Sequence, residues 1–202
     1  TAKSCLYRYD QIWNRGTNDA NDFSLRGIGF HACAHRYIER LVAAKIEQDH
    51  EEALLAFVEG IASSLTPSHL VPEVHQIFSK WAEHFGLDLK AFVGAEEHQM
   101  GDTQHVFTPD LLYARPECFE VVDFKTYWAM LTEDQIRADF QARFYAFNAM
   151  RIWKNFPRYR FTHSYVRFGK SVSVDFLPSD LDGFVDEVSA VAATITEATE
   201  RN

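Results

Sequence analysis

The chain has 202 residues, 47% of them apolar and 14% aromatic, with a formal net charge of −9. This length and apolar content exclude a disordered or fibrous protein and suffice for one domain with a buried core. The acidic balance excludes a protein that coats nucleic acid by general electrostatic attraction, because such affinity needs Lys and Arg at many phosphates.

The first part of the chain, residues 1–87, is predicted to be mainly helical. An aromatic-rich segment at 4–13 forms a short helix or an extended arm and is followed by a polar loop. Apolar residues then recur at near-helical spacing over 25–48, and a second helix covers 51–65. A third helix begins at Pro72, a favourable first-turn residue, and Gly86 can close it.

Residues 88–178 have the composition of a sheet with one long helix inserted into it. Short segments rich in Val, Phe and Leu, separated by polar or Gly/Pro turns, predict three strands at 89–93, 106–114 and 119–124. A helix over 133–154 follows, capped at its start by Thr132 and ended by Pro157. Two further strands, at 160–168 and 171–176, form a hairpin around Gly169.

The last segment, 179–202, is predicted to carry a helix from 181 to about 200. The order of helices, three strands, helix, two strands and helix predicts one α/β domain over 1–202, with a mixed sheet flanked by helices.

Two acids and a lysine stand near strand ends in the predicted sheet. Asp110 follows Pro109 on one strand, and Asp123-Phe124-Lys125 lies on the next. If the two strands pair as a hairpin, the carboxylates converge, and hard oxygen ligands suit Mg²⁺ or Mn²⁺. Lys125 lies on the same strand face as Asp123 and can orient a water or offset charge growing on a phosphate. By itself, an Asp-x-Lys is more often a strand-end salt bridge.

Three other groups of residues favour the catalytic interpretation. Glu96 and Glu97 follow the first predicted strand. Gln141 and Tyr145 share one face of the long helix. An early helix contains Gly27 to His31, whose small residues allow close approach.

With these motifs in this order, the chain resembles the RecB-type branch of the PD-(D/E)XK nuclease superfamily. The motifs of that branch are a Gly-x-x-x-His, a glutamate, an Asp, an Asp-x-Lys and a Gln-x-x-x-Tyr. The resemblance implies a restriction-endonuclease-like core and DNA as the substrate. It also implies a helicase or recombination partner.

The resemblance also implies a role for each matching residue. His31, Asp110 and Asp123 would bind Mg²⁺ or Mn²⁺, together with the Phe124 backbone carbonyl. Lys125 and Glu97, with Glu96 as the alternative glutamate, would position or activate the attacking water. Gln141 and Tyr145 would contact the DNA backbone or brace the site.

Cysteine usage gives two further expectations. Cys5, Cys33 and Cys118 form no CxxC pair, which is typical of a reducing cytosol. Several RecB-type relatives carry one early and three late cysteines that hold an iron–sulfur cluster; this chain has no late cysteines, so we expect no such cluster in it. The sequence has no signal-peptide pattern and no membrane-length apolar run, so we expect a cytoplasmic or nucleoid-associated protein without a membrane partner.

Other interpretations of the same residues remain open. His31, His35 and Glu39 on one helix imitate a zinc-binding face, although they lack the HExxH acid. The aromatic residues of the long helix either stack on bases or, as their spacing favours, pack in the core. The later half concentrates basic residues that form either a nucleic-acid surface or a solvated face, namely Arg137, Arg143, Arg151, Lys154, Arg158, Arg160, Arg167 and Lys170.

The sequence therefore predicts a Mg²⁺- or Mn²⁺-dependent deoxyribonuclease, with an exonuclease favoured by the resemblance. Repair, recombination or phage DNA processing would be its setting. The leading alternative is a catalytically silent module of the same fold that binds nucleic acid or protein, and a His31/His35 metallohydrolase is a more distant one.

Overall fold

The computed structural model describes residues 22–64, 66–95, 99–102 and 105–200. Its α-helices are α2 (Asp22–Ala44), α3 (His50–Ser63), α4 (Val71–Ala82), α5 (Glu133–Ala138), α6 (Phe140–Ile152) and α7 (Phe184–Glu200). Its strands are β1 (Phe92–Gly94), β2 (Gln99–Asp102), β3 (His105–Phe107), β4 (Leu111–Arg115), β5 (Cys118–Lys125), β6 (Tyr159–Tyr165) and β7 (Lys170–Phe176). A 3₁₀ turn, η2 (Pro178–Leu181), precedes α7. The segment 4–13 and the candidates Glu96 and Glu97 lie outside the described residues.

One mixed five-stranded sheet forms the centre of the molecule, in the order β1-β4-β5-β6-β7. The β4–β5 and β6–β7 pairs are antiparallel hairpins, whereas β5 and β6 are parallel. The parallel pair needs a crossover, and α5 and α6 supply it. The predicted mixed sheet, flanked by helices and preceded by a helical part, is confirmed.

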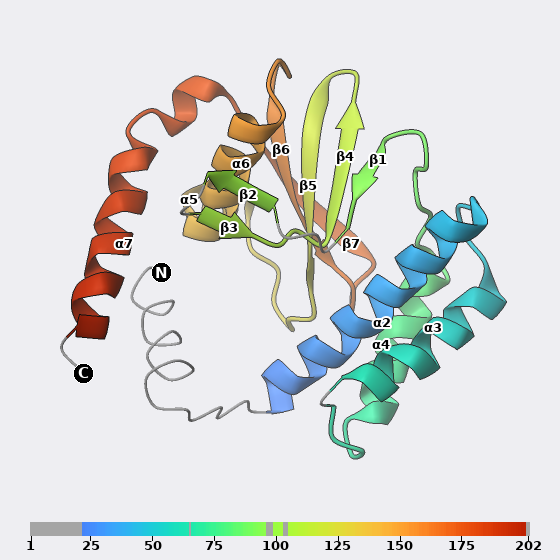
Figure 1. Ribbon diagram of the computed structural model, residues 1–202. Helices are drawn as coiled ribbons and strands as arrows, with labels where there is room; N and C mark the ends of the chain where they lie inside the picture. The colour runs from blue at the N-terminus through green and yellow to red at the C-terminus, as the bar shows by residue number, and fades with distance from the viewer. Residues whose placement is uncertain (1–21, 65, 96–98, 103–104, 201–202) are drawn as a thin grey trace.

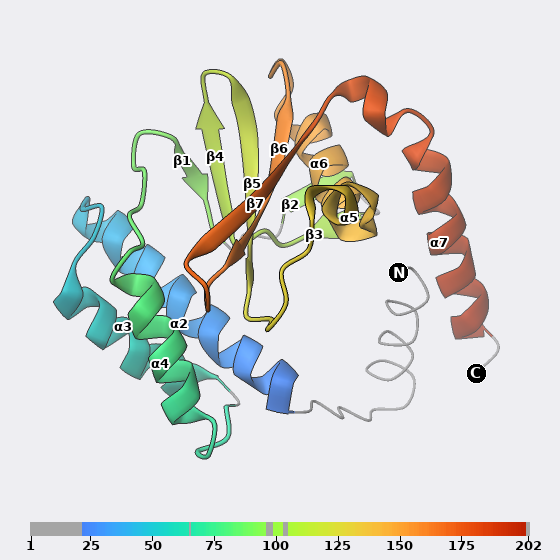
Figure 2. The same ribbon diagram turned by 180° about the vertical axis from the view of Figure 1, so that it is seen from behind.

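The two faces of the sheet are covered by different helices. Helices α2, α3 and α4 lie against one face, and α5 and α6 against the other (Figures 1 and 2). Alternation along β5 divides its side chains accordingly: Val122 and Phe124 join the α2–α4 core, whereas Phe119 and Val121 join the α5–α7 core. A central strand with both faces covered is buried almost throughout, as the apolar run of β5 predicts.

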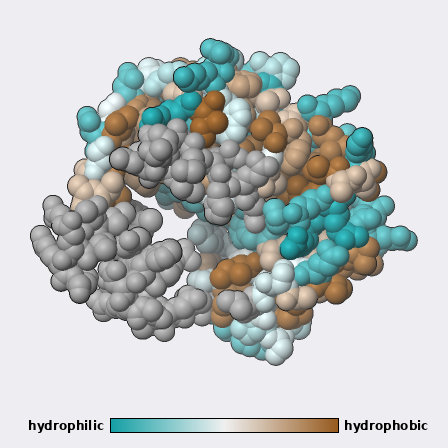
Figure 3. Space-filling model, in the orientation of Figure 1, coloured by the Kyte–Doolittle hydropathy of each residue, from teal (hydrophilic) through white to brown (hydrophobic). Residues whose placement is uncertain are grey.

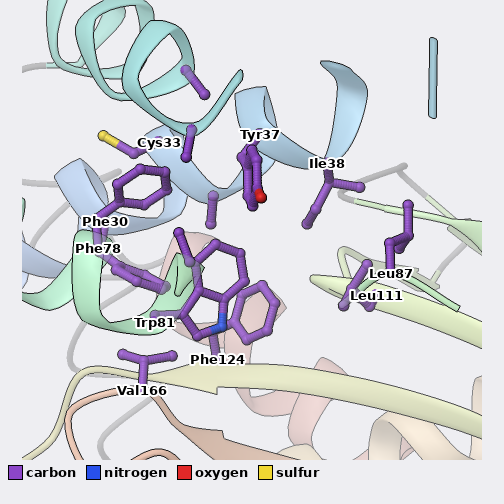
Figure 4. Close-up of a cluster of buried hydrophobic side chains, with 14 of the residues drawn as sticks. Phe30, Cys33, Tyr37, Ile38, Phe78, Trp81, Leu87, Leu111, Phe124 and Val166 are labelled. Atoms are coloured by element: carbon purple, nitrogen blue, oxygen red, sulfur yellow. The ribbon is translucent and has the colours of Figure 1, made fainter. Parts of the chain in front are cut away.

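The core between the sheet and α2–α4 is rich in aromatic rings. Phe124 meets Phe30 and Trp81 edge to face, with ring centroids 6.0 Å and 5.2 Å away (Figure 4). Glycine makes the close helix packing possible, because a Cβ at Gly60 would lie 2.5 Å from the Cα of Cys33. At Gly29 a Cβ would lie 2.4 Å from Thr66 Oγ1, whereas at Gly27 its nearest contact would be an ordinary 3.6 Å. The expected close approach at the early glycines therefore depends on Gly29.

The outer side of this helical layer carries ion pairs together with exposed apolar side chains, such as Leu54 and Val58 of α3. Hydrophilic residues gather over α2 and α3 (Figure 3), where Arg40 pairs with both Glu52 and Glu59. These ion pairs join the two helices on the solvent side, opposite the aromatic core. Among the described residues, no helix is both long and apolar enough to cross a membrane.

The segment predicted as one strand over 106–114 is two strands in different sheets. β3 pairs with β2 in a separate two-stranded sheet, and β4 belongs to the main sheet. The break falls at Pro109, which has no N–H to donate to a ladder, and at Asp110, whose side chain bonds to the neighbouring strand. The prediction missed this break although Pro109 marks it.

The helix predicted over 133–154 is also interrupted. Asp139 has an extended backbone (φ −72°, ψ 133°), and its side chain accepts a hydrogen bond from Ala142 N, so it ends α5 and caps α6. The expected cap of the first piece is present, since Thr132 and Gln135 form a capping box. A residue that fits a helical pattern has instead become an N-cap.

Two other helix ends differ from the prediction, and one turn agrees with it. Helix α4 ends at Ala82, before Gly86, and α7 begins at Phe184, after Gly183 takes a positive φ of 77°. The predicted β6–β7 hairpin is confirmed, with Gly169 at φ 60° in its turn.

Candidate active site

The candidate acids lie at the end of the sheet where β4 begins and β5 ends. The antiparallel register pairs Leu111 with Val122, so Asp110, one residue earlier, lies opposite Asp123. Both side chains are buried. The predicted convergence of the two carboxylates is therefore present.

Asp110 is held by two bonds from different elements. Its Oδ2 accepts a hydrogen bond from the Phe124 backbone N–H, and its Oδ1 lies 2.8 Å from His31 Nδ1. Since a carboxylate only accepts, His31 presents its Nδ1–H to Asp110. Helix α2 thus brings His31 to the end of the sheet.

Asp123 is surrounded by Lys125 and Gln141. Lys125 Nζ lies 2.7 Å from Asp123 Oδ2 and donates to Gln141 Oε1 at 3.0 Å. Gln141 Nε2 in turn donates to Asp123 Oδ1 at 3.4 Å. The Gln141 amide therefore bonds to both Asp123 and Lys125. These two residues lie on the same face of β5, the face that α6 covers.

Burial dominates the electrostatics of this pair. Desolvation raises the pKa of Asp123 to about 6; Lys125 opposes that rise, and Asp110 adds to it. Burial also works against the charged form of Lys125, but the adjacent Asp123 outweighs it, so the Lys125 pKa is raised. Asp123 is therefore a buried carboxylate that one lysine compensates only in part.

His163 is a site residue that the sequence analysis missed. The parallel register places His163 of β6 beside Asp123 of β5, where its side chain is 2% exposed and its Nε2 lies 3.6 Å from Asp123 Oδ2. This separation exceeds a hydrogen bond; among the described residues His163 Nε2 has no hydrogen-bond partner, whereas Asp123 Oδ2 is paired with Lys125 Nζ. Sequence spacing contains no signal for this contact, because only the β5–β6 register creates it.

A tyrosine contacts the other ring nitrogen of His163. Tyr165 Oη accepts the Leu131 N–H at 2.8 Å and lies 3.3 Å from His163 Nδ1, so its hydroxyl hydrogen can be donated to that nitrogen. Burial, reinforced by Lys125, lowers the pKa of His163 to about 3. The ring is therefore neutral, and its Nε2 is the nitrogen on the side of Asp123.

Tyr145, one helical turn after Gln141, braces the strand connection. Its hydroxyl donates to the Thr108 carbonyl at 2.9 Å, directly before Pro109-Asp110, and its ring packs edge to face against Phe161. Of the two roles expected for Gln141 and Tyr145, the described contacts are those of bracing residues. Glu96 and Glu97, the expected water-activating acids, lie outside the described residues.

Comparison with known proteins assigns the family. A model of the PD-(D/E)XK nuclease superfamily matches residues 1–201, nearly the whole chain. The chain belongs to the PD-(D/E)XK nuclease superfamily. Its mixed sheet, with helices on both faces, is the restriction-endonuclease-like fold. The same comparisons matched no curated protein and no solved structure to the chain.

Membership in this nuclease superfamily implies DNA as substrate and a divalent metal as cofactor. The donor set is suited to a hard cation, because Asp123 Oδ2 is a buried carboxylate oxygen, paired with Lys125 Nζ, and Asp110 lies opposite. Within the described ranges, no three His, Cys, Asp or Glu side chains gather closely enough to form a metal cluster. The ligands predicted from the sequence, Asp110, Asp123, His31 and the Phe124 carbonyl, therefore do not form a ready cluster in this arrangement, and a bound ion would have to draw the three side chains closer together.

The zinc-face interpretation of α2 finds no support in the described contacts. His31 faces Asp110, whereas His35 Nε2 pairs with Glu39 at 3.3 Å along the helix surface. The two histidines therefore interact with different groups in the described part of the chain.

Several of the basic residues in the later half form ion pairs within the protein. Arg143 makes two bonds of 2.6 and 2.8 Å to Glu187, and Asp175 accepts from both Arg158 and Arg160. These contacts favour the interpretation of this group as solvated and paired, because paired guanidinium groups attract phosphate less.

Proposed function

We propose that this PD-(D/E)XK protein is a Mg²⁺- or Mn²⁺-dependent deoxyribonuclease of the RecB type, acting as an exonuclease. The observation that carries the hydrolytic assignment is the placement of Asp110 opposite Asp123, with Lys125 2.7 Å from Asp123. The exonuclease preference rests on the RecB-type resemblance. So does a setting in DNA repair, recombination or phage DNA processing, with a helicase or recombination partner in the cytoplasm or nucleoid.

The metal would be held by Asp110, Asp123, His31 and the Phe124 carbonyl. When bound, such a cation polarises the scissile phosphoryl oxygen and stabilises the leaving oxygen. It would also offset the cost of burying Asp123, for which Lys125 is the compensating charge in the described arrangement.

Lys125 would orient the attacking water and offset charge growing on the phosphate. Its ammonium is held by Asp123 on one side and by the Gln141 amide on the other. A cation fixed before the reaction stabilises developing charge without reorganising at that moment. Gln141 therefore acts as a positioning residue, and a glutamate, Glu97 or Glu96, would complete the activation of water.

The decisive experiment is metal-dependent digestion of linear and circular DNA, single- and double-stranded. Wild type is compared with Asp123→Asn and with Asp134→Asn, a matched change of an exposed acid on α5. We expect Asp123→Asn to lose at least about a hundredfold in rate, the scale of one lost electrostatic group, and Asp134→Asn to keep activity. Equal rates for all three proteins would exclude the assigned site.

Metal binding is tested without turnover by the thermal midpoint. A ligand that binds only the folded state raises the midpoint with concentration, so Mn²⁺ should stabilise wild type more than Asp123→Asn. A wild type that binds DNA but neither cuts it nor responds to either metal would favour the catalytically silent module.

A further inference from the structure

Three aromatic side chains are left exposed directly beside the candidate site. Trp128 is 66% exposed, Tyr127 40% and Phe23 39%. Tyr127 and Trp128 follow Lys125 in the loop 126–131, and Phe23 lies in the first turn of α2. We call these three residues the aromatic platform.

The loop that carries the platform is fixed at both ends. Arg167 Nε donates to the Thr126 carbonyl at 2.7 Å, and the Leu131 amide donates to Tyr165 Oη at 2.8 Å. Tyr165 is also the residue that contacts His163 beside Asp123. The position of the platform is therefore tied to that of the acidic site.

Trp128 itself rests on a rigid support. The Arg167 guanidinium lies 3.9 Å from the centre of the Trp128 ring, and Glu73 accepts from the same guanidinium at 2.7 Å. Stacking on a fixed cation orders the indole in advance, while two thirds of its surface stays open to solvent. An ordered and exposed ring loses little entropy when it stacks on a ligand.

The other two rings of the platform stack on each other beside Lys125. Phe23 and Tyr127 stack with centroids 5.4 Å apart and planes 20° apart, and Lys125 Nζ lies 5.5 Å from the Tyr127 ring. Glu73 joins Arg26, 2.6 Å away, to Arg167, so this triad carries two formal positive charges against one negative. Flat rings beside net positive charge complement a nucleotide, which combines a planar base with an anionic phosphate.

We propose that the aromatic platform binds unpaired bases of single-stranded DNA next to the cleavage site. In a duplex both faces of an internal base are covered by its neighbours, so only an unpaired or terminal base can lie on Trp128. The inference rests on the proposed nuclease function and refines its substrate to a single strand or an unpaired end.

The test measures binding in EDTA, where no cutting occurs. The probes are a fluorescein-labelled oligothymidylate and a blunt duplex of equal length, and the proteins are wild type, Trp128→Leu, Trp128→Phe and Val58→Ala. Val58, on α3, is 66% exposed and serves as a control for loss of an exposed apolar side chain. Thermal midpoints verify that each variant is folded.

We expect Trp128→Leu to weaken single-strand binding roughly tenfold, as loss of one base–aromatic stack does. Trp128→Phe keeps an aromatic ring and restores most of the affinity. Duplex binding changes less than about twofold, Val58→Ala behaves as wild type, and the tryptophan fluorescence quenched by oligothymidylate in wild type is no longer quenched in Trp128→Leu.

Several results would overturn the platform. They are single-strand affinity unchanged in Trp128→Leu, an equal loss for duplex and single strand, or no binding of oligothymidylate by wild type. A dimer that dissociates in Trp128→Leu while DNA binding persists would instead identify a protein-docking face.

Failure of the nuclease assignment is distinguishable from these results. If wild type binds single strands through Trp128 but never cuts DNA, the binding role of the platform is supported and the nuclease assignment is excluded. If wild type and Trp128→Leu cut single strands at equal rates, the nuclease assignment is supported and the binding role of the platform is excluded.

Discussion

Near the end of strand β5, its two faces differ in chemical character. On one face, Phe124 is enclosed by the rings of Phe30 and Trp81 in a core of apolar side chains. On the other face, Asp123 and Lys125 are buried beside Gln141 and His163. The aromatic face stabilises the strand that holds costly buried charges on its other side, since such charges by themselves destabilise a fold.

The largest expected effect of a single change lies on the aromatic face. Phe124→Ala should lower the free energy of unfolding by about 3–5 kcal/mol, because a buried ring is lost and a cavity remains. Urea denaturation in EDTA measures this loss. Phe168→Ala, at a ring 38% exposed, should change stability by less than about 0.5 kcal/mol.

A loss below about 1 kcal/mol for Phe124→Ala would mean that this face does not stabilise β5. If the variant is too unstable to purify, Phe124→Leu tests the same point with a smaller cavity and a loss of about 1.5 kcal/mol or less.

The next effect lies on the charged face and should appear in activity. Lys125→Met keeps most of the side-chain volume and removes the ammonium, so the rate of DNA cleavage should fall about 10²–10³-fold. Lys154→Met, at an exposed lysine after α6, is the matched control and should cleave at the wild-type rate. Retained cleavage in Lys125→Met would show that the charged face is structural.

His163 sharpens the comparison, because it is as buried as a core residue yet its Nε2 faces Asp123. His163→Asn removes the nitrogen that faces Asp123, whereas a glutamine side chain extends far enough to put an amide nitrogen in its place. We expect kcat to fall about tenfold in His163→Asn and to recover in His163→Gln, with KM for DNA unchanged in both. Steady-state kinetics with thermal midpoints separate this role from packing, since parallel losses of stability and kcat in both variants would indicate a structural histidine.

The smallest expected effect on stability and activity comes from the N-cap of α6, the helix that carries Gln141 on the charged face. Asp139→Ala removes the cap of α6 and should cost about 1 kcal/mol of stability by urea denaturation. Because α6 carries Gln141, cleavage should also slow, though far less than in Lys125→Met. Asp182→Ala, in the exposed turn before α7, should leave both quantities unchanged, and an equal cost for the two changes would argue against the cap.

Local patterns were sufficient to predict most of the architecture. Apolar periodicity identified the helical part before the sheet, and Gly169 identified the last hairpin. The errors fell where a side chain overrides local propensity: Asp139 leaves the helical pattern to cap α6, and Pro109 separates β3 from β4. Both residues lie on segments that lead into the candidate site.

By itself, the sequence determined the mixed α/β class and the pairing of Asp110 with the Asp-x-Lys, because a hairpin register depends on nearby residues. The roles assigned to His31, Asp110, Asp123, Lys125 and Gln141 stay predictions until the variants are measured. Only the tertiary structure decided that His163 lies beside Asp123 and that Trp128 rests on Arg167. Both contacts join residues that are distant in sequence. The first depends on the register of the parallel β5–β6 pair, and the second joins the segments that follow these two strands. The register of a parallel pair cannot be predicted from a local sequence pattern, because its strands are connected by a long crossover.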